Sequence, residues 1–367
     1  MNPLLQNFCV SPLSELPTPV TRLSSIGKVF GHPDLFIKQD NLSGKTYGGN
    51  KVRKLEFLLG EAVAEGRKSV ITYGAAGSNH ALATAICCRE LGLKAISILA
   101  PQETSAHVRK NILMQHATGA ELMLCPDFHD FPEATAQAIA RCKKNDGIEP
   151  YIIPTGGTNA VGALGFVNAA FELIPQATRL PCPDVIYIPM GTGGTLAGLL
   201  VGLKLAGLKT RVEAIRVVEK EFRNETHIKQ LCDELIENIL SSQSPGNTED
   251  QVKENFMPPY LRGKEIPVIK ESDIIIRDEF FGEGYGIPTP EAEEAVELFQ
   301  TLENVYLETT YTGKATAALL HDLRSGKLDH RTVLYWNTLN SRDFSSEIVN
   351  IDFHDLPAGF HPYFSCV

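Results

Sequence analysis

The chain has 367 residues, of which 43% are hydrophobic and 21% are charged, the composition of an ordinary globular protein. Because one hydrophobic core rarely supports so long a chain, two domains are expected. The formal net charge of −10 argues against nucleic acid as a partner, since no basic excess is available to neutralise phosphates. The sequence contains no apolar run of about twenty residues, so we expect no membrane-spanning helix.

The first elements follow a run of glycine, asparagine and lysine at residues 48–56, GGNKVRKLE. Apolar residues recur at helical spacing from Leu55 to Val63, which predicts a helix that begins near Lys51. Backbone N–H groups at a helix N-terminus disfavour an ammonium group, so a lysine there can titrate unusually low. Such a lysine is suited to forming a Schiff base with a carbonyl compound. The alternative is that Lys51 and its two basic neighbours form a solvated cluster.

Strands and helices then alternate along the chain. The pattern predicts strands over 69–73, 94–99 and 121–124, and helices over 79–91, 107–118 and 133–143. Three successive strand–helix units favour a parallel, doubly wound α/β sheet with right-handed crossovers. The alternation resumes with predicted strands over 184–188, 212–218 and 305–307, and helices over 196–205, 225–240 and 317–323.

Two segments lack a regular pattern. Residues 241–257 are polar and predict an exposed excursion between ordered parts. The stretch 353–367 contains prolines and a glycine, and predicts an irregular tail. Its aromatic residues Phe360, Tyr363 and Phe364 indicate that this tail packs against the protein.

A glycine loop joins a predicted strand to a predicted helix at Met190-Gly191-Thr192-Gly193-Gly194-Thr195. Glycines let the backbone approach a ligand closely, and N–H groups and threonine hydroxyls then bind an anion. The loop lacks the lysine of a Walker A motif and the spacing of a dinucleotide fingerprint, so a terminal monophosphate is the expected ligand. The alternative is a tight turn that needs glycine for its backbone angles alone.

Three further motifs are candidates for binding or catalysis. In Gly74–His80, Ser78 or Asn79 either caps the following helix or faces a small carboxylate, whereas His80 is a packed or surface histidine without a proton-transfer role. Residues 311–316, YTGKAT, form a loop before a helix, with Lys314 exposed if the loop has no function. Tyr285 lies between Gly284 and Gly286, a weak pattern by itself.

These motifs, in this order, resemble the pyridoxal-phosphate enzymes of the tryptophan-synthase-β type, from about Pro17 to about Thr338. The run at 48–56 is similar to the branch of 1-aminocyclopropane-1-carboxylate (ACC) deaminase and D-cysteine desulfhydrase. The resemblance implies an α/β protein of two domains, each a twisted, mostly parallel sheet flanked by helices, with pyridoxal 5′-phosphate (PLP) in the cleft between them (PLP fold type II). It places a large PLP-binding domain at 1–50 and 165–367, and a small domain at 51–164 with the substrate-carboxylate loop.

The resemblance also assigns roles to individual residues. Lys51 would hold the cofactor as a Schiff base, and Asn79 would lie against its ring hydroxyl. Its phosphate would be bound by the glycine loop, namely Gly191, Thr192, Gly193, Gly194 and Thr195. Ser78, Asn79 and His80 match the loop that binds the substrate carboxylate, and Ser78 is also expected to be catalytic. Tyr285 and Tyr311 match catalytic tyrosines beside the substrate, and Thr312 falls where a residue faces the pyridine nitrogen.

The sequence departs from the family around the substrate. Position 312 is a glutamate in the deaminase branch, and the neutral Thr312 matches the desulfhydrase branch. A neutral residue there predicts a weaker electron sink, which favours β-elimination over opening of a cyclopropane ring. Gly77 replaces the usual glutamine, Ala81-Leu82-Ala83 lacks the usual basic residue, and Asn337-Thr338-Leu339-Asn340 replaces His-Thr-Gly-Gly.

We therefore expect a PLP-dependent lyase or deaminase that acts on a small amino acid, by α,β-elimination of D-cysteine or a related β-substituted amino acid. The products would be pyruvate, ammonia and sulfide. The alternatives are an ACC deaminase, an amino-acid racemase and a non-catalytic PLP-binding protein. The eight cysteines show neither metal-site nor disulfide-framework spacing, and residues 1–6 lack a secretory signal. Hence we expect a cytoplasmic protein without a bound metal. We also expect a homodimer.

Overall fold

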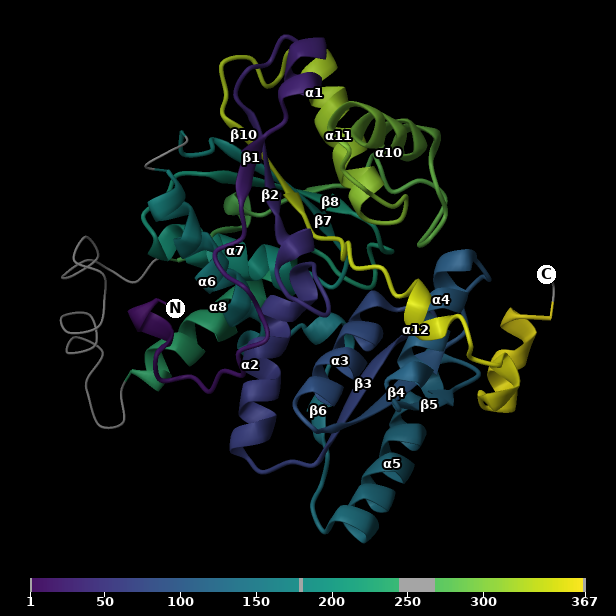
Figure 1. Cartoon of the computed structure of the whole chain (residues 1–367). Coiled ribbons are helices and arrows are strands. Elements are labelled where there is room, and N and C mark those ends of the chain that lie inside the picture. Colours follow the sequence, from purple (N-terminus) through teal and green to yellow (C-terminus); the bar gives the residue numbers. More distant parts are fainter. Residues whose placement is uncertain (1, 178–180, 244–267, 366–367) are drawn as a thin grey trace. The chain divides into compact units, whose positions relative to one another are not determined.

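The computed structural model describes residues 2–177, 181–243 and 268–365 (Figure 1). It divides into two compact units. Unit 1 comprises residues 1–8, 14–54 and 159–341, and unit 2 comprises 9–13, 55–158 and 342–367. The predicted excursion lies outside the described residues from position 244 onward.

Unit 1 is built on a six-stranded sheet with the strand order β1-β2-β10-β7-β8-β9. Only β1 runs antiparallel to its neighbour, and the other adjacent pairs are parallel. The strands are β1 (Val20–Arg22), β2 (Leu35–Gln39), β7 (Val185–Met190), β8 (Arg211–Arg216), β9 (Ile275–Arg277) and β10 (Val333–Asn337). The helices are α1 (Ser24–Val29), α6 (Ala160–Gln176), α7 (Gly194–Leu205), α8 (Glu225–Ser242), α10 (Pro290–Glu303) and α11 (Thr312–Arg324).

Unit 2 contains a four-stranded, fully parallel sheet with the order β5-β4-β3-β6. Its strands are β3 (Ser69–Ala75), β4 (Lys94–Ala100), β5 (Glu121–Leu124) and β6 (Tyr151–Ile153). Its helices are α3 (Asn79–Glu90), α4 (Ala106–Ala117), α5 (Phe131–Asp146) and α12 (Ser345–Ile348). Helix α2 (Asn50–Ala64) begins in unit 1 and continues into unit 2.

Short 3₁₀ helices complete the structure. They are η1 (Pro3–Leu5), η2 (Asp40–Leu42), η3 (Phe128–Asp130), η4 (Thr155–Gly157), η5 (Glu271–Asp273), η6 (Phe353–Asp355) and η7 (Ala358–Tyr363). The last two belong to the tail that was expected to be irregular. Phe360 and Tyr363 are buried there, which confirms that the tail packs through its aromatic residues.

The α/β class and two parallel-type sheets flanked by helices confirm the expected fold. Strand β5 has the predicted bounds, and most other predicted elements agree within a few residues. The predicted strand at 305–307 is wrong, because residues 304–308 have no regular structure. Helix α11 begins at Thr312 rather than 317, so residues 312–316 form its first turns instead of a loop.

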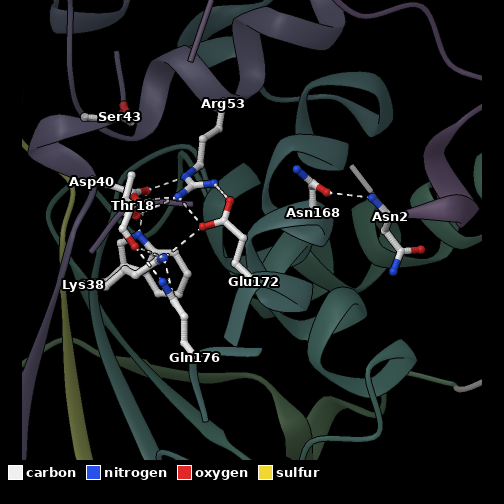
Figure 2. Close-up of polar contacts among 11 residues, drawn as sticks. Asn2, Thr18, Lys38, Asp40, Ser43, Arg53, Asn168, Glu172 and Gln176 are labelled. Atoms are coloured by element: carbon white, nitrogen blue, oxygen red, sulfur yellow. Dashed lines mark hydrogen bonds and ion pairs between the residues drawn. The ribbon is translucent and has the colours of Figure 1, made fainter. Parts of the chain in front are cut away.

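The start of α2 is fixed by a buried cluster of charges (Figure 2). Arg53 donates from Nε to Asp40 Oδ2 at 2.7 Å and from Nη1 to Glu172 Oε1 at 2.6 Å. Lys38 donates to Glu172 Oε2 at 2.9 Å, and Trp336 Nε1 donates to Asp40 Oδ2 at 2.7 Å. Arg53, Asp40 and the Lys38 ammonium are fully buried, so two cations and two carboxylates balance within one protein interior.

The electrostatics of this cluster depend on its complete pairing. Burial alone would raise the pKa of Asp40, but Arg53, Lys38 and Trp336 together hold that pKa below its usual value. Burial lowers the pKa of the Lys38 ammonium despite the opposing effect of Glu172. Removal of one partner from a buried ion pair leaves an uncompensated charge, which costs more than the pair contributes net.

We predict that Arg53→Met lowers the free energy of unfolding by roughly 3–5 kcal/mol, because Asp40 and Glu172 lose their shared cation. The matched control is Arg141→Met, which breaks the exposed ion pair with Glu121 and should change stability by about 1 kcal/mol or less. Chemical denaturation measures both values. Equal losses in the two variants would contradict the importance of the buried cluster.

Candidate active site

Lys51 is the second residue of α2, at the predicted helix start. Its side chain is only partly accessible to solvent. Burial lowers its pKa from 10.5 to about 8. Within the described residues, its ammonium group makes no hydrogen bond or ion pair that would favour the charged form. Lys51 can therefore supply a neutral, nucleophilic amine near neutral pH.

The turn before Lys51 requires glycine. Gly49 has φ +86°, and a Cβ there would lie 2.6 Å from Thr338 O. The Gly48 N–H donates to Asn340 Oδ1 at 2.7 Å, and the Asn50 N–H donates to Thr338 O at 3.1 Å. Asn340, one of the departures from the family, thus serves to hold this turn.

The glycine loop follows β7 and leads into α7. Gly193 is the N-cap of α7 with φ +86°. The loop is therefore a tight turn that needs glycine for its backbone angles, as the alternative predicted. Asn50 Nδ2 donates to Thr195 Oγ1 at 3.1 Å, which joins the residue before Lys51 to this loop. Arg223 Nε donates to Thr192 O at 3.2 Å, and this hydrogen bond holds the loop from a residue beyond α7 in the sequence. The Thr195 hydroxyl oxygen accepts the bond from Asn50, which leaves its hydrogen to donate to an anion.

The two candidate tyrosines lie together in unit 1. Their hydroxyl oxygens are 2.8 Å apart, and their rings meet edge to face. A Cβ on Gly191 would lie 3.4 Å from Tyr311 Cε1, so Tyr311 is adjacent to the glycine loop. Burial raises the pKa of both phenols, which keeps them protonated.

Lys314 holds the loop that carries Tyr285. Its ammonium donates to Phe281 O at 2.6 Å and to Gly284 O at 3.2 Å. The side chain is fully buried, so the alternative of an exposed lysine at this position is wrong. Burial lowers the pKa of Lys314.

Thr312 is fully buried at the first turn of α11. Its hydroxyl accepts from the Glu308 N–H at 2.8 Å and lies 3.1 Å from both Glu308 Oε1 and Glu308 O. Glu308 was not singled out from the sequence. An acidic residue just before a helix, where its side chain can accept hydrogen bonds from the first backbone N–H groups, was the signal that could have identified it.

In unit 2, Ser78 is the N-cap of α3, and its hydroxyl oxygen accepts from the Ala81 N–H at 3.2 Å. The helix-capping alternative is therefore observed, although the hydroxyl hydrogen is not used in that bond. Asn79 Oδ1 accepts from Asn111 Nδ2 at 3.0 Å. His80 is buried, as the packed alternative predicts.

Two residues that the sequence did not indicate support this loop. Asn111 Nδ2 also donates to Gly77 O at 2.8 Å, and a carbonyl oxygen can only accept, so the orientation of the Asn111 amide is determined. The Gly77 N–H donates to Gln102 Oε1 at 3.0 Å. A Cβ on Gly77 would lie 2.7 Å from Val108 Cγ2, so the local packing excludes the usual glutamine. No short-range pattern predicts these contacts.

The structure thus groups the candidates by unit. Unit 1 holds Lys51, the glycine loop, Tyr285, Tyr311 and Thr312, whereas unit 2 holds Ser78, Asn79 and His80. Among the residues that the structure describes, no group of three or more histidine, cysteine, aspartate or glutamate side chains could hold a metal ion. No helix in the described ranges is both long and apolar enough to cross a membrane.

Residues 12–338 match the family model described as pyridoxal-phosphate dependent enzyme. The chain belongs to this family. A solved structure of an ACC deaminase homologue is 30% identical, with a TM-score of 0.72 over 94% of this chain and 97% of the other. A fungal L-serine ammonia-lyase from Rhizomucor miehei is 19% identical (TM-score 0.55, 89% and 94% covered). Serine racemase from Dictyostelium discoideum is 20% identical (TM-score 0.56, 89% and 93% covered), and these last two show the fold alone.

As a pyridoxal-phosphate dependent enzyme, the chain uses PLP as its cofactor. The residues of unit 1 fit that group. A lysine whose pKa burial lowers to about 8 suits a bond to an aldehyde. A glycine turn at the N-terminus of α7, with a threonine hydroxyl beside it, suits a phosphate.

The lowered pKa of Lys51 makes a prediction for the cofactor-free protein. Only the neutral amine reacts with an amine-specific reagent, so labelling of Lys51 should rise with pH and reach half its maximum near pH 8. Peptide mass spectrometry across a pH series measures the labelled fraction. Lys45, whose side chain is 81% exposed, is the comparison. A Lys51 curve that coincides with the Lys45 curve would contradict the effect of burial.

Proposed function

We propose that this enzyme is a lyase or deaminase of small amino acids, and that its main reaction is α,β-elimination from D-cysteine or a related β-substituted amino acid. Cysteine and water would yield pyruvate, ammonia and hydrogen sulfide. The observation that carries the proposal is Lys51, which combines a lowered pKa with a neighbour, Asn50, bonded to the phosphate-loop residue Thr195.

The proposed roles follow from the chemistry of each side chain. When bound, PLP supplies the electron sink that makes loss of the Cα hydrogen possible. Lys51 holds the cofactor and, once released as a free amine, accepts the Cα proton. Tyr285 and Tyr311 are hydrogen bonded to each other and remain protonated, so they can donate a proton to the leaving group.

We assign the substrate carboxylate to the loop of unit 2. Ser78 has its hydroxyl hydrogen available, because its oxygen already accepts from Ala81. Gln102 uses Oε1 to accept from Gly77, which leaves its NH₂ group as a donor at the same loop. We infer that Gln102 supplies the amide that the usual glutamine at position 77 would bring. Asn79 and His80 complete this proposed site.

The second candidate is an ACC deaminase, which would open the cyclopropane ring and release 2-oxobutyrate and ammonia. The 30% identical ACC deaminase homologue favours it. The Glu308 carboxylate next to Thr312 also favours an ACC deaminase, because it places a negative charge beside the neutral Thr312. A racemase has only fold-level support. Three departures suggested a non-catalytic binder, namely Gly77, Ala81 and Asn337. Gly77 packs against Val108, and Asn337 Oδ1 accepts from the Leu339 N–H at 3.2 Å, so these two have internal structural reasons.

The division at 51–164, the homodimer and the cytoplasmic location remain predictions of the same proposal.

A side-by-side assay decides between the candidates. We expect pyruvate release from D-cysteine and β-chloro-D-alanine to exceed 2-oxobutyrate release from ACC, because a good leaving group at Cβ lowers the demand on the electron sink. The L-amino acids belong in the same panel, and Lys51→Ala is the inactive control. Faster turnover of ACC would establish the second candidate instead. If the protein with bound cofactor turned over none of the amino acids in the panel, it would be a non-catalytic binder.

A further inference from the structure

The carboxylate of Glu308 is built into the turn that precedes α11. It accepts three backbone hydrogen bonds, from the N–H groups of Thr310 (2.8 Å), Tyr311 (2.9 Å) and Thr312 (2.8 Å). These bonds hold a carboxylate in one position at a helix N-terminus, where a negative charge is favoured. Glu308 therefore places an anion beside two residues already assigned to the cofactor and the substrate.

The hydroxyl of Thr312 is committed to Glu308. It accepts from the Glu308 N–H at 2.8 Å, and its hydrogen can be donated to Glu308 Oε1 or Glu308 O, each at 3.1 Å. The Tyr335 phenol is a further neighbour of this hydroxyl. A hydroxyl has one hydrogen and two lone pairs. With the hydrogen donated to Glu308 and one lone pair used, Thr312 has only a lone pair to offer another group. A ring nitrogen in contact with this oxygen must then carry a hydrogen itself.

We propose that Glu308, acting through Thr312, keeps the pyridine nitrogen of the cofactor protonated. The inference rests on the position that the proposed function gives to Thr312. A carboxylate at position 308 would then do indirectly what a glutamate at position 312 does directly. The consequence for substrate class is that amino acids without a good leaving group at Cβ, such as ACC, come within reach of the enzyme.

The other ionisable groups around Glu308 are consistent with this role. Tyr311, Tyr285 and Tyr335 are phenols whose pKa burial raises, and the Glu308 charge raises each further, so they stay neutral. Lys314 is the neighbouring cation, and its ammonium is directed to the carbonyl groups of Phe281 and Gly284. Glu219 acts on Tyr285 and Lys314 and adds negative charge. An opposite charge within about 4–6 Å favours the protonated form of a base.

The test is the ¹⁵N chemical shift of the ring nitrogen in holoenzyme loaded with ¹⁵N-labelled PLP. We expect a protonated nitrogen in the wild type at neutral pH and a mostly unprotonated one in Glu308→Gln. Thr312→Val should have the same effect, and the double variant should add nothing further. Identical shifts in wild type and Glu308→Gln, or a wild type that is already unprotonated, would overturn the proposal. An unchanged shift in Thr312→Val would overturn the route through the hydroxyl.

Glu303→Gln is the matched control. The Glu303 carboxylate also accepts two backbone hydrogen bonds at a helix start, from the N–H groups of Ser25 and Ile26. The Glu303→Gln variant should leave the ¹⁵N shift unchanged. If its shift equalled that of Glu308→Gln, the effect would come from loosened packing instead. Circular dichroism and cofactor titration establish that each variant is folded and loaded. A wild type that responds to Glu308→Gln but turns over no amino acid would refute the proposed function and leave the role of Glu308 standing.

Discussion

The site in unit 1 depends on the buried pairing of Arg53 with Asp40 and Glu172. Arg53 lies two residues after Lys51 on α2, so its bonds fix the first turn of the helix that carries the lysine. Asp40 holds the helix and the turn before it, because its carboxylate binds Arg53 of α2 and its backbone carbonyl accepts from the Gly49 N–H at 2.6 Å. Because water cannot solvate the buried charges of Arg53 and Asp40, the two side chains must stay paired, and the pairing restricts the position of the helix start.

The same helix start is tied to the rest of the unit by short polar contacts. Asn50 connects it to Thr195 of the glycine loop, and a Cβ on Gly191 of that loop would touch Tyr311. Tyr311 is in turn bonded to Tyr285 and held by Glu308. The lysine, the glycine loop and the tyrosines thus form one connected set, and such preorganisation is what a cofactor-dependent reaction needs.

Local sequence patterns predicted the features that depend on near neighbours. Helical spacing located α2 and its lysine, and glycines between a strand and a helix located the loop at Gly193. The strand expected at 305–307 failed because a short apolar run does not distinguish a strand from an extended approach to a helix. Gln102, Asn111 and Glu308 were missed because their importance lies in the groups they contact, and for Gln102 and Asn111 those groups are 25 and 34 residues away.

We propose that Lys51, and no other buried lysine, holds the cofactor. Burial also lowers the pKa of Lys54 and Lys314, so each of them is a chemically reasonable competitor. Borohydride reduction of the holoenzyme followed by peptide mass spectrometry locates the bound cofactor directly. We expect the reduced adduct on Lys51 and its loss in Lys51→Ala. An adduct on Lys54 or Lys314 in the wild type would contradict it.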